Sequence, residues 1–183
     1  GQQIVLEQAN RKIEESDGTV LHSDSGALVY TANAEKTVAK VMYNKVSIPR
    51  GGEYRLELAD GTKVWLNAAT ELRFPVNFTG DMREVYLKGE AYFQVKRDEK
   101  HPFIVHTSMG AVEGLGTRFN VRDYEDEREV VTTLETGKVM YVSGNTREKV
   151  TLNPGYQVLE KESSPVEVRK VDPLQYTGWR EGK

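Results

Sequence analysis

Apolar and polar residues alternate with a period of two along almost every segment after Gly18. Residues that favour turns, mainly Gly, Asp, Asn and Pro, interrupt this alternation about every eight to twelve residues, as is typical of short antiparallel strands. A helical period occurs only around Tyr176 and at residues 6–13, where helix and strand are equally favoured. The sequence therefore predicts an all-β fold of many short antiparallel strands in stacked hairpins, forming a two-layered, sandwich-like or solenoid-like domain.

The clearest hairpin spans residues 52–67, in which two alternating runs meet at Asp60 and Gly61. A two-residue turn would divide the apolar side chains between both faces of this hairpin. A three-residue loop over residues 59–61, with Gly61 in the left-handed conformation, gathers them on one face. We therefore predict the three-residue loop, and we expect an ion pair and a cation–π contact on the other face. The expected cross-strand pairs are Tyr54 with Leu66, Leu56 with Val64, Glu57 with Lys63 and Arg55 with Trp65.

The composition narrows the possible functions. The 183 residues fit one domain, and the absence of Cys excludes disulfides, thiolate zinc sites, iron–sulfur clusters and a cysteine nucleophile. The 25 Lys and Arg residues are scattered among 28 Asp and Glu residues, which gives a formal net charge of -3. Because nucleic-acid-binding domains usually carry a clustered basic excess, we expect no nucleic-acid partner.

Apolar runs in this chain are short. The longest uninterrupted ones, at residues 27–30 and 139–142, have four residues, whereas a membrane-spanning helix needs about 20. The first residues, Gly1-Gln2-Gln3, have neither the basic start nor the apolar stretch of a signal peptide. We therefore expect no direct membrane contact by this stretch of chain, and we interpret it as a fragment of a longer protein.

Residues that could carry catalysis are sparse. Of the histidines, only His101 and His106 are close in sequence, and their five-residue spacing across Pro102 does not favour a metal site. The glycines in residues 114–117 lie between strand patterns, which favours a bulge or a close strand crossing over a phosphate-binding loop. The acidic runs at residues 98–99 and 125–127 are typical of solvated turns. We predict no enzyme activity, no catalytic or metal-ligating residues and no cofactor.

Aromatic residues offer a second hypothesis. Five of them could form a platform for a sugar or a peptide, so a carbohydrate-binding extracytoplasmic β module is an alternative function. Packing within strands also explains most of the set. Trp65 is the exception, because the hairpin register places it opposite the apolar face. The five residues are Tyr54, Trp65, Tyr86, Tyr92 and Trp179.

Six motifs in a fixed order resemble the FecR family, and most of all its Bacteroidetes branch. This family comprises the extracytoplasmic domains of transmembrane anti-sigma factors. The resemblance runs over residues 48–159, and more loosely over residues 17–30. Gln94 stands where relatives commonly carry Glu, and residues 125–129 form a charged excursion, so neither is given a family role. The motifs are residues 48–54, 58–67, 72–75, 85–95, 101–105 and 115–121.

Most motif residues are expected to be structural, because the family gives no contact residues for this β domain. Candidates for a binding surface come instead from the hairpin and the turn before it: Arg50, Arg55, Lys63 and Trp65. The motif residues expected to be structural are Pro49, Gly51, Gly52, Asp60, Gly61, Leu66, Asn67, Gly89, Glu90, Phe93, Pro102, Phe103, Gly116, Thr117, Phe119 and Asn120.

The resemblance also implies a domain organisation and a function. Residues 1–171 would form a FecR-like all-β periplasmic domain, and residues 172–183 a linker into a C-terminal α/β domain outside this chain. The full-length protein would be anchored to the inner membrane. It would bind the N-terminal signalling domain of a TonB-dependent outer-membrane transporter. Through its cytoplasmic part, it would pass the signal to an extracytoplasmic-function (ECF) sigma factor. The sequence identifies neither the transporter nor the imported nutrient.

Overall fold

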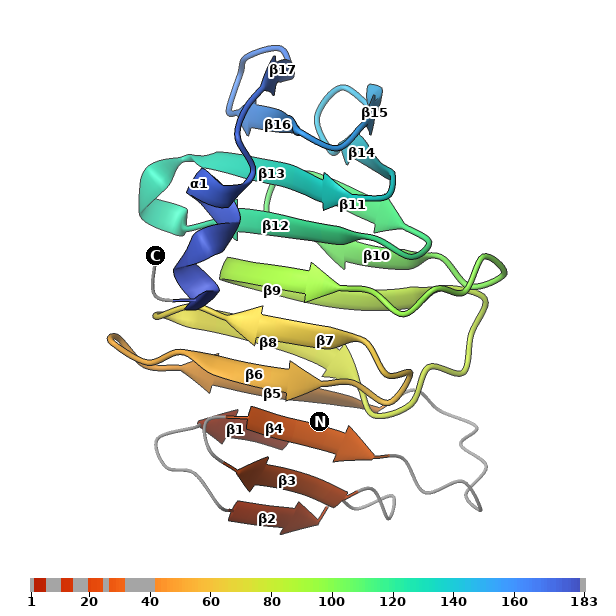
Figure 1. The fold of residues 1–183 in the computed structure, drawn as a ribbon, viewed down its shortest axis with the longest axis vertical. Coiled ribbons are helices and arrows are strands. Elements are labelled where there is room, and N and C mark those ends of the chain that lie inside the picture. Colours follow the sequence, from red (N-terminus) through yellow and green to blue (C-terminus); the bar gives the residue numbers. More distant parts are fainter. Residues whose placement is uncertain (1, 6–10, 15–19, 25–26, 32–41, 182–183) are drawn as a thin grey trace.

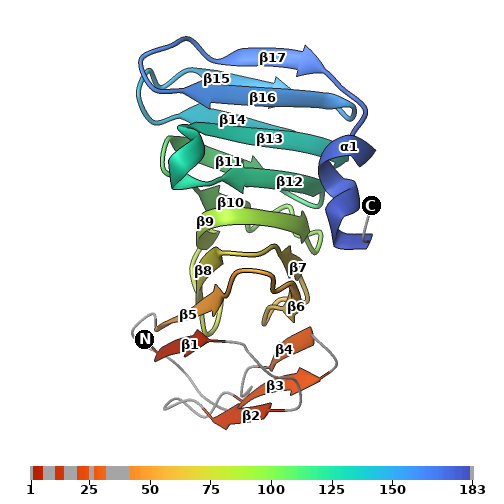
Figure 2. The same ribbon diagram turned by 90° about the vertical axis from the view of Figure 1, so that its left-hand side faces the viewer.

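The structure, a computed structural model, describes residues 2–5, 11–14, 20–24, 27–31 and 42–181. It confirms an all-β fold, in which a curled, mixed sheet forms two facing layers (Figures 1 and 2). Residues 11–14 form a strand, whereas residues 6–10 of the segment left open between helix and strand lie outside the described residues.

The two layers share one long strand, β9 (Arg83–Gln94). Sheet A contains, in spatial order, β1 (Gln2–Val5), β5 (Tyr43–Ile48), β8 (Thr70–Pro75), the first half of β9, β10 (Phe103–His106), β11 (Gly110–Gly114), β14 (Val139–Ser143) and β15 (Lys149–Leu152). Sheet B contains β2 (Arg11–Glu14), β3 (Val20–Asp24), β4 (Ala27–Thr31), β6 (Tyr54–Glu57), β7 (Lys63–Leu66), the second half of β9, β12 (Arg118–Asp123), β13 (Glu129–Thr136), β16 (Tyr156–Lys161) and β17 (Glu167–Lys170).

Three of the described strand pairs are parallel, although the sequence pattern predicted antiparallel strands. These pairs are β1 with β5, β4 with β6, and β9 with β10. In each pair the chain leaves one sheet, passes through the other and returns, so the second strand repeats the direction of the first. The fold therefore combines hairpins with solenoid-like coils.

Gly89 marks the point where β9 passes from one sheet to the other. Lys88 pairs with Glu71 in sheet A, whereas Gly89 pairs with Asp123 in sheet B. The backbone of Gly89 has a φ of +110°, and a Cβ there would lie 2.4 Å from Thr70 Oγ1. Only glycine accommodates both the conformation and the close approach.

The core lies between the two sheets and contains side chains from both. Leu66, Phe93, Phe103 and Phe119 have no exposed surface. The rings of Phe93 and Phe119 stack with centroids 5.2 Å apart, and Phe103 lies 6.0 Å from Phe93. These four motif residues hold the two layers together by apolar burial.

The predicted hairpin loop is confirmed. Leu56 pairs with Val64 and Tyr54 with Leu66, as the three-residue loop requires. The amide of Leu58 donates to the carbonyl of Thr62 at 2.8 Å, and Gly61 has a φ of +92°. The alternation of apolar and polar positions in the sequence was therefore sufficient to predict this register.

The other face of the hairpin differs from the prediction. Arg55 lies opposite Trp65, but the guanidinium stacked on the Trp65 indole belongs to Arg180. Glu57 lies opposite Lys63, and the described ion pairs do not include this pair. Tertiary contacts from the C-terminal residues therefore replace the predicted cross-strand contact at Trp65.

The last described residues lie on the outer face of sheet B. After β17, the short helix α1 (Leu174–Thr177) packs against β12 and β13, and the 3₁₀ turn η2 (Gly178–Glu181) follows (Figure 2). In the part of the chain that the structure describes, neither helix length nor apolar content reaches what a membrane-crossing helix needs.

Candidate functional site

A row of neighbouring side chains crosses the outer face of sheet B, with one residue from each of five strands. Four of the five are buried, although the outer face of a two-layered fold normally meets solvent. The helix α1 lies over this region, where it contacts β12 and β13 (Figures 1 and 2). The five residues are Trp65, Tyr92, Asn120, Thr133 and Gln157.

Glu90 carries a buried carboxylate beside this row, and only 3% of the residue is exposed. Its Oε1 accepts a hydrogen bond from Asn67 Nδ2 at 2.9 Å and forms a salt bridge with Arg122 Nη1 at 3.0 Å. Its Oε2 accepts a hydrogen bond from Asn120 Nδ2 at 2.8 Å. Removing a carboxylate from water is costly unless it is paired, and these three donors offset that cost.

Arg122 connects this buried carboxylate to the surface. Its Nε and Nη2 donate to the two carboxylate oxygens of Glu127 at 2.8 and 2.5 Å. The hydrogen bonding to Glu127 raises the pKa of Arg122 above its usual value; burial opposes this rise, and the charge of Glu90 reinforces it. The Arg122 guanidinium also lies 5.0 Å over the ring of Tyr124. The charged excursion at residues 125–129 thus contributes a partner to the network.

Asn120 connects the Glu90 carboxylate to the C-terminal residues. Its Nδ2 donates to Glu90, and its Oδ1 accepts a hydrogen bond from the indole Nε1 of Trp179 at 2.9 Å. The side-chain amide of Asn120 therefore donates a hydrogen bond at its nitrogen and accepts one at its oxygen. Rotating this amide would place donor against donor at Trp179, so the two contacts fix each other's geometry.

Arg180 completes the contact between the C-terminal residues and sheet B. Its guanidinium lies 4.1 Å over the Tyr92 ring and 5.3 Å over the Trp65 ring. These two rings pack edge to face at 5.5 Å. The Tyr92 hydroxyl donates to Glu135 at 2.9 Å, and burial followed by this hydrogen bond raises the pKa of Tyr92 to about 12.

The C-terminal segment is residues 174–181, and the C-terminal seat is the set Trp65, Tyr92 and Asn120 that contacts its last turn. The seat joins a buried polar network to the point where the described chain ends. We take the seat together with Glu90 as the candidate functional site.

The four predicted surface candidates do not gather at one place. Trp65 is part of the seat and is half-buried beneath Arg180. Arg55 is exposed on the neighbouring strand, and Lys63 is half-buried at the start of β7. Arg50 is exposed and lines a shallow hollow together with Asn67, Arg122 and residues 124–127.

Several motif residues shape turns and close approaches. Gly52 donates its amide to the carbonyl of Pro49 at 3.1 Å, and Gly51 has a φ of +76°. A Cβ on Gly116 would lie 2.7 to 2.9 Å from atoms of Arg97. Next to the buried Thr117, the ladder between β12 and β13 shifts register. A close approach therefore occurs at Gly116, whereas the register shift lies just outside residues 114–117, between Arg118 and Phe119.

Arg83 is a buried residue that the sequence pattern did not single out. Only 2% of it is exposed, and its guanidinium forms a salt bridge with Asp60 at 2.7 Å. It also donates to the carbonyls of His101 and Lys96, each at 2.7 Å. Its own amide donates to the carbonyl of Pro102. Asp60 and Pro102 thus belong to a region in which one guanidinium ties several loops together.

The five aromatic residues of the carbohydrate-binding hypothesis do not form one platform. Trp65, Tyr92 and Trp179 meet at the seat, where the C-terminal segment lies on the first two. Tyr54 packs against the core. Tyr86 is exposed on the outer face of sheet A instead, where its ring stacks on His106 with centroids 4.7 Å apart.

The two neighbouring histidines have separate carboxylate partners. His101 Nδ1 lies 2.8 Å from Asp98 Oδ2, and hydrogen bonding to His101 lowers the pKa of Asp98. His106 Nε2 lies 3.0 Å from Glu84 Oε1. The described residues contain no group of three or more His, Asp or Glu side chains placed to hold a metal ion.

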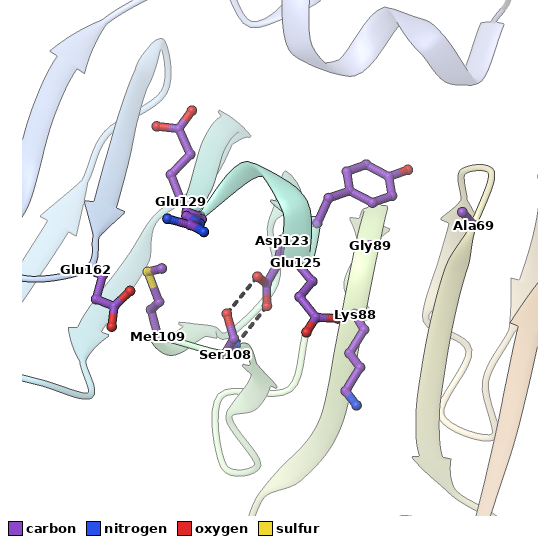
Figure 3. A pocket seen from close by; sticks show the side chains of 11 residues that line it. Ala69, Lys88, Gly89, Ser108, Met109, Asp123, Glu125, Glu129 and Glu162 are labelled. Carbon is purple, nitrogen blue, oxygen red and sulfur yellow. Dashed lines mark hydrogen bonds between the residues drawn. The ribbon is translucent and has the colours of Figure 1, made fainter.

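A pocket of about 440 Å³ opens beside β9 and the turn η1 (Glu125–Glu127) (Figure 3). Its most buried carboxylate, Asp123, accepts hydrogen bonds from the amide and the hydroxyl of Ser108, both at 2.7 Å. Both carboxylate oxygens thus have donors. The remaining charged side chains lining the pocket are of both signs, which indicates no particular ligand.

Comparison with known proteins places this geometry in context. A family model described as FecR protein matches residues 44–140. Two crystal structures from Parabacteroides distasonis, each of a protein assigned as an anti-sigma factor, are 34% and 35% identical to the chain, with TM-scores of 0.74 and 0.72. The matches cover 77% and 75% of this chain but 66% and 65% of those chains. No curated protein matches the chain.

Proposed function

The chain belongs to the FecR family, and we propose that it is the periplasmic signal-sensing and interaction module of an inner-membrane anti-sigma factor. In this proposal it relays a signal from a TonB-dependent outer-membrane transporter to an ECF sigma factor. The transporter's N-terminal signalling domain is the periplasmic partner. The sigma factor is reached through a cytoplasmic part of the protein outside this chain. The module itself acts by binding and not by catalysis.

One observation carries the proposal beyond family membership. The hydrogen bonds from Trp179 through Asn120 to Glu90 connect the end of the described chain to a buried network of sheet B. A relay needs two states of the protein that a partner binds with different affinity. A specific, polar contact between a domain and its exit segment provides a place where such states can differ.

A binding titration tests the relay. The chain, and a longer form that includes the expected C-terminal α/β domain, are each titrated by calorimetry with the isolated signalling domain of the cognate transporter. We expect saturable binding by the longer form at least. The signalling domain of an unrelated transporter is the matched control and should not bind. Absence of binding by both forms would refute the relay.

A further inference from the structure

The chain fills the C-terminal seat with two of its own residues, Trp179 and Arg180. We propose that the seat holds Trp179 and Arg180 reversibly, as a latch, and that release of this latch is the change by which the domain reports partner binding. The ligand of the seat is a peptide that presents an indole N–H and, next to it, a guanidinium. Here the same chain supplies both groups. The regulatory part of this inference rests on the proposed function.

The seat recognises specific side chains of the segment. Trp179 contributes a directional hydrogen bond to Asn120, and Arg180 a cation–π contact with Tyr92. Arg180 is largely buried against the seat, with 17% of its side chain exposed. Its guanidinium lies over the Tyr92 and Trp65 rings and has one described carboxylate partner, Glu181 at 3.5 Å. Aromatic faces are a common binding surface for a guanidinium, and the buried Nε of Arg180 has no described hydrogen-bond partner.

The rest of the segment has two buried residues, Thr177 and Gly178, so the latch depends mainly on the side chains of Trp179 and Arg180. The helix α1 has four residues, and a helix of this length does not persist in isolation. Its largest apolar side chain, Leu174, is 61% exposed. Of its four residues, only Thr177 is buried. Losing one hydrogen bond or one cation–π contact changes such a docking equilibrium by about two- to tenfold.

Release has a consequence inside the domain. When Trp179 leaves, Asn120 Oδ1 loses its described donor while Asn120 Nδ2 still donates to Glu90. The amide is then no longer fixed from both ends, and the contact to Glu90 loosens. The docked and released states therefore differ in the buried network as well as in the path of the chain. A partner that prefers either state shifts the equilibrium by its differential affinity.

Hydrogen exchange on the full chain tests the latch. Trp179→Phe removes the indole N–H donor together with part of the ring, and Arg180→Ala removes the guanidinium together with its aliphatic stem. Each should raise amide exchange in residues 174–181 by about two- to tenfold, and the double variant should raise it further. Leu174→Ala, which changes an exposed side chain of the same helix, is the matched control. Exchange in β9 and β12 should stay at the wild-type rate in all variants, which separates release from unfolding.

The latch is overturned if both variants leave exchange in residues 174–181 unchanged. It is also overturned if protection of this segment in the wild type rises with protein concentration, because a second copy would then fill the seat. Its regulatory part is tested with the longer form and the transporter's signalling domain. If the latch is regulatory, Trp179→Phe and Arg180→Ala change the affinity of the longer form for the signalling domain in the same direction. Affinities equal to that of the wild type would refute the regulatory part. No binding by any form refutes the relay and leaves the exchange result to decide the latch.

Discussion

Glu90→Gln is expected to destabilise the protein because it brings two hydrogen-bond donors face to face, and the effect extends to Trp179. A glutamine oxygen in the place of Oε1 keeps the hydrogen bonds from Asn67 and Arg122. Its amide nitrogen then faces Asn120 Nδ2, so donor meets donor. Rotating the Asn120 amide cures this conflict but creates a second one with the indole N–H of Trp179. One hydrogen bond is therefore lost in either arrangement.

The magnitude follows from the burial of the groups involved. An unmade hydrogen bond at a buried site costs about 1–3 kcal/mol. Loss of the Glu90 charge also weakens the contact with Arg122, but the Arg122 side chain is 41% exposed, so solvent screens this part. The expected destabilisation is about 2–4 kcal/mol in total. For a domain of this size it lowers the melting temperature by about 4–16 °C.

Urea unfolding followed by tryptophan fluorescence measures the effect. Glu127→Gln is the matched control, because it makes the same chemical change on the exposed side of the same arginine. We expect the control to cost less than about 1 kcal/mol. Equal destabilisation by the two variants would show that the buried network contributes nothing specific.

A double-mutant cycle isolates the proposed route of the conflict. In a Trp179→Phe background the indole donor is absent, so the Asn120 amide can rotate and accept from the substituted glutamine. The cost of Glu90→Gln should then fall by about 1 kcal/mol relative to the wild-type background. Additive effects would mean that Asn120 does not transmit the conflict.

Three further predictions concern other positions. Gly89→Ala should destabilise the protein by about 2–4 kcal/mol in thermal unfolding, because it combines a left-handed backbone with a Cβ placed against Thr70. A loss of stability below about 0.5 kcal/mol would contradict the required close approach. Arg83→Lys should cost about 2–3 kcal/mol, because an ammonium cannot reach the same acceptors, whereas the exposed Arg97→Lys should be neutral in the same assay. The pKa of Tyr92 in the folded state is raised to about 12, so its contribution to stability is complete below about pH 10 and is lost as the pH rises towards 12. Tyr92→Phe should reduce this alkaline loss of stability in denaturation curves recorded across that range. An unchanged loss would contradict the assignment.

The hairpin could be predicted because its register depends on which positions in the sequence, odd or even, carry apolar residues. Alternation along residues 52–67 left one register in which the apolar side chains of the two strands, apart from Trp65, share a face, and the structure has that register. Two-layered β structure follows from the same pattern repeated along the chain. The parallel strand pairs were not predictable, since alternation has the same period in parallel and antiparallel strands.

The candidate site could not be assembled from the sequence. Its contacts join residues far apart in the chain: Asn67 and Glu90 are 23 positions apart, Asn120 and Trp179 are 59 apart. Which strands become neighbours decides such contacts, and the period-two pattern does not encode the spatial order of strands. Arg83 was missed for a related reason, because a charged residue at the start of a strand is usually solvated.

The two buried charged residues of β9 differ in what holds them, and this difference locates the adjustable part of the domain. Apart from Asp60, the acceptors of the Arg83 guanidinium are backbone carbonyls of loops, at His101, Lys96, Asp98 and Leu115. Backbone acceptors move only when the loops themselves move. The oxygens of Glu90 accept instead from side chains, and side chains can exchange partners without a change of fold. In the proposed relay, the fixed charge of the domain therefore lies in sheet A and its adjustable charge in sheet B, beside residues 174–181.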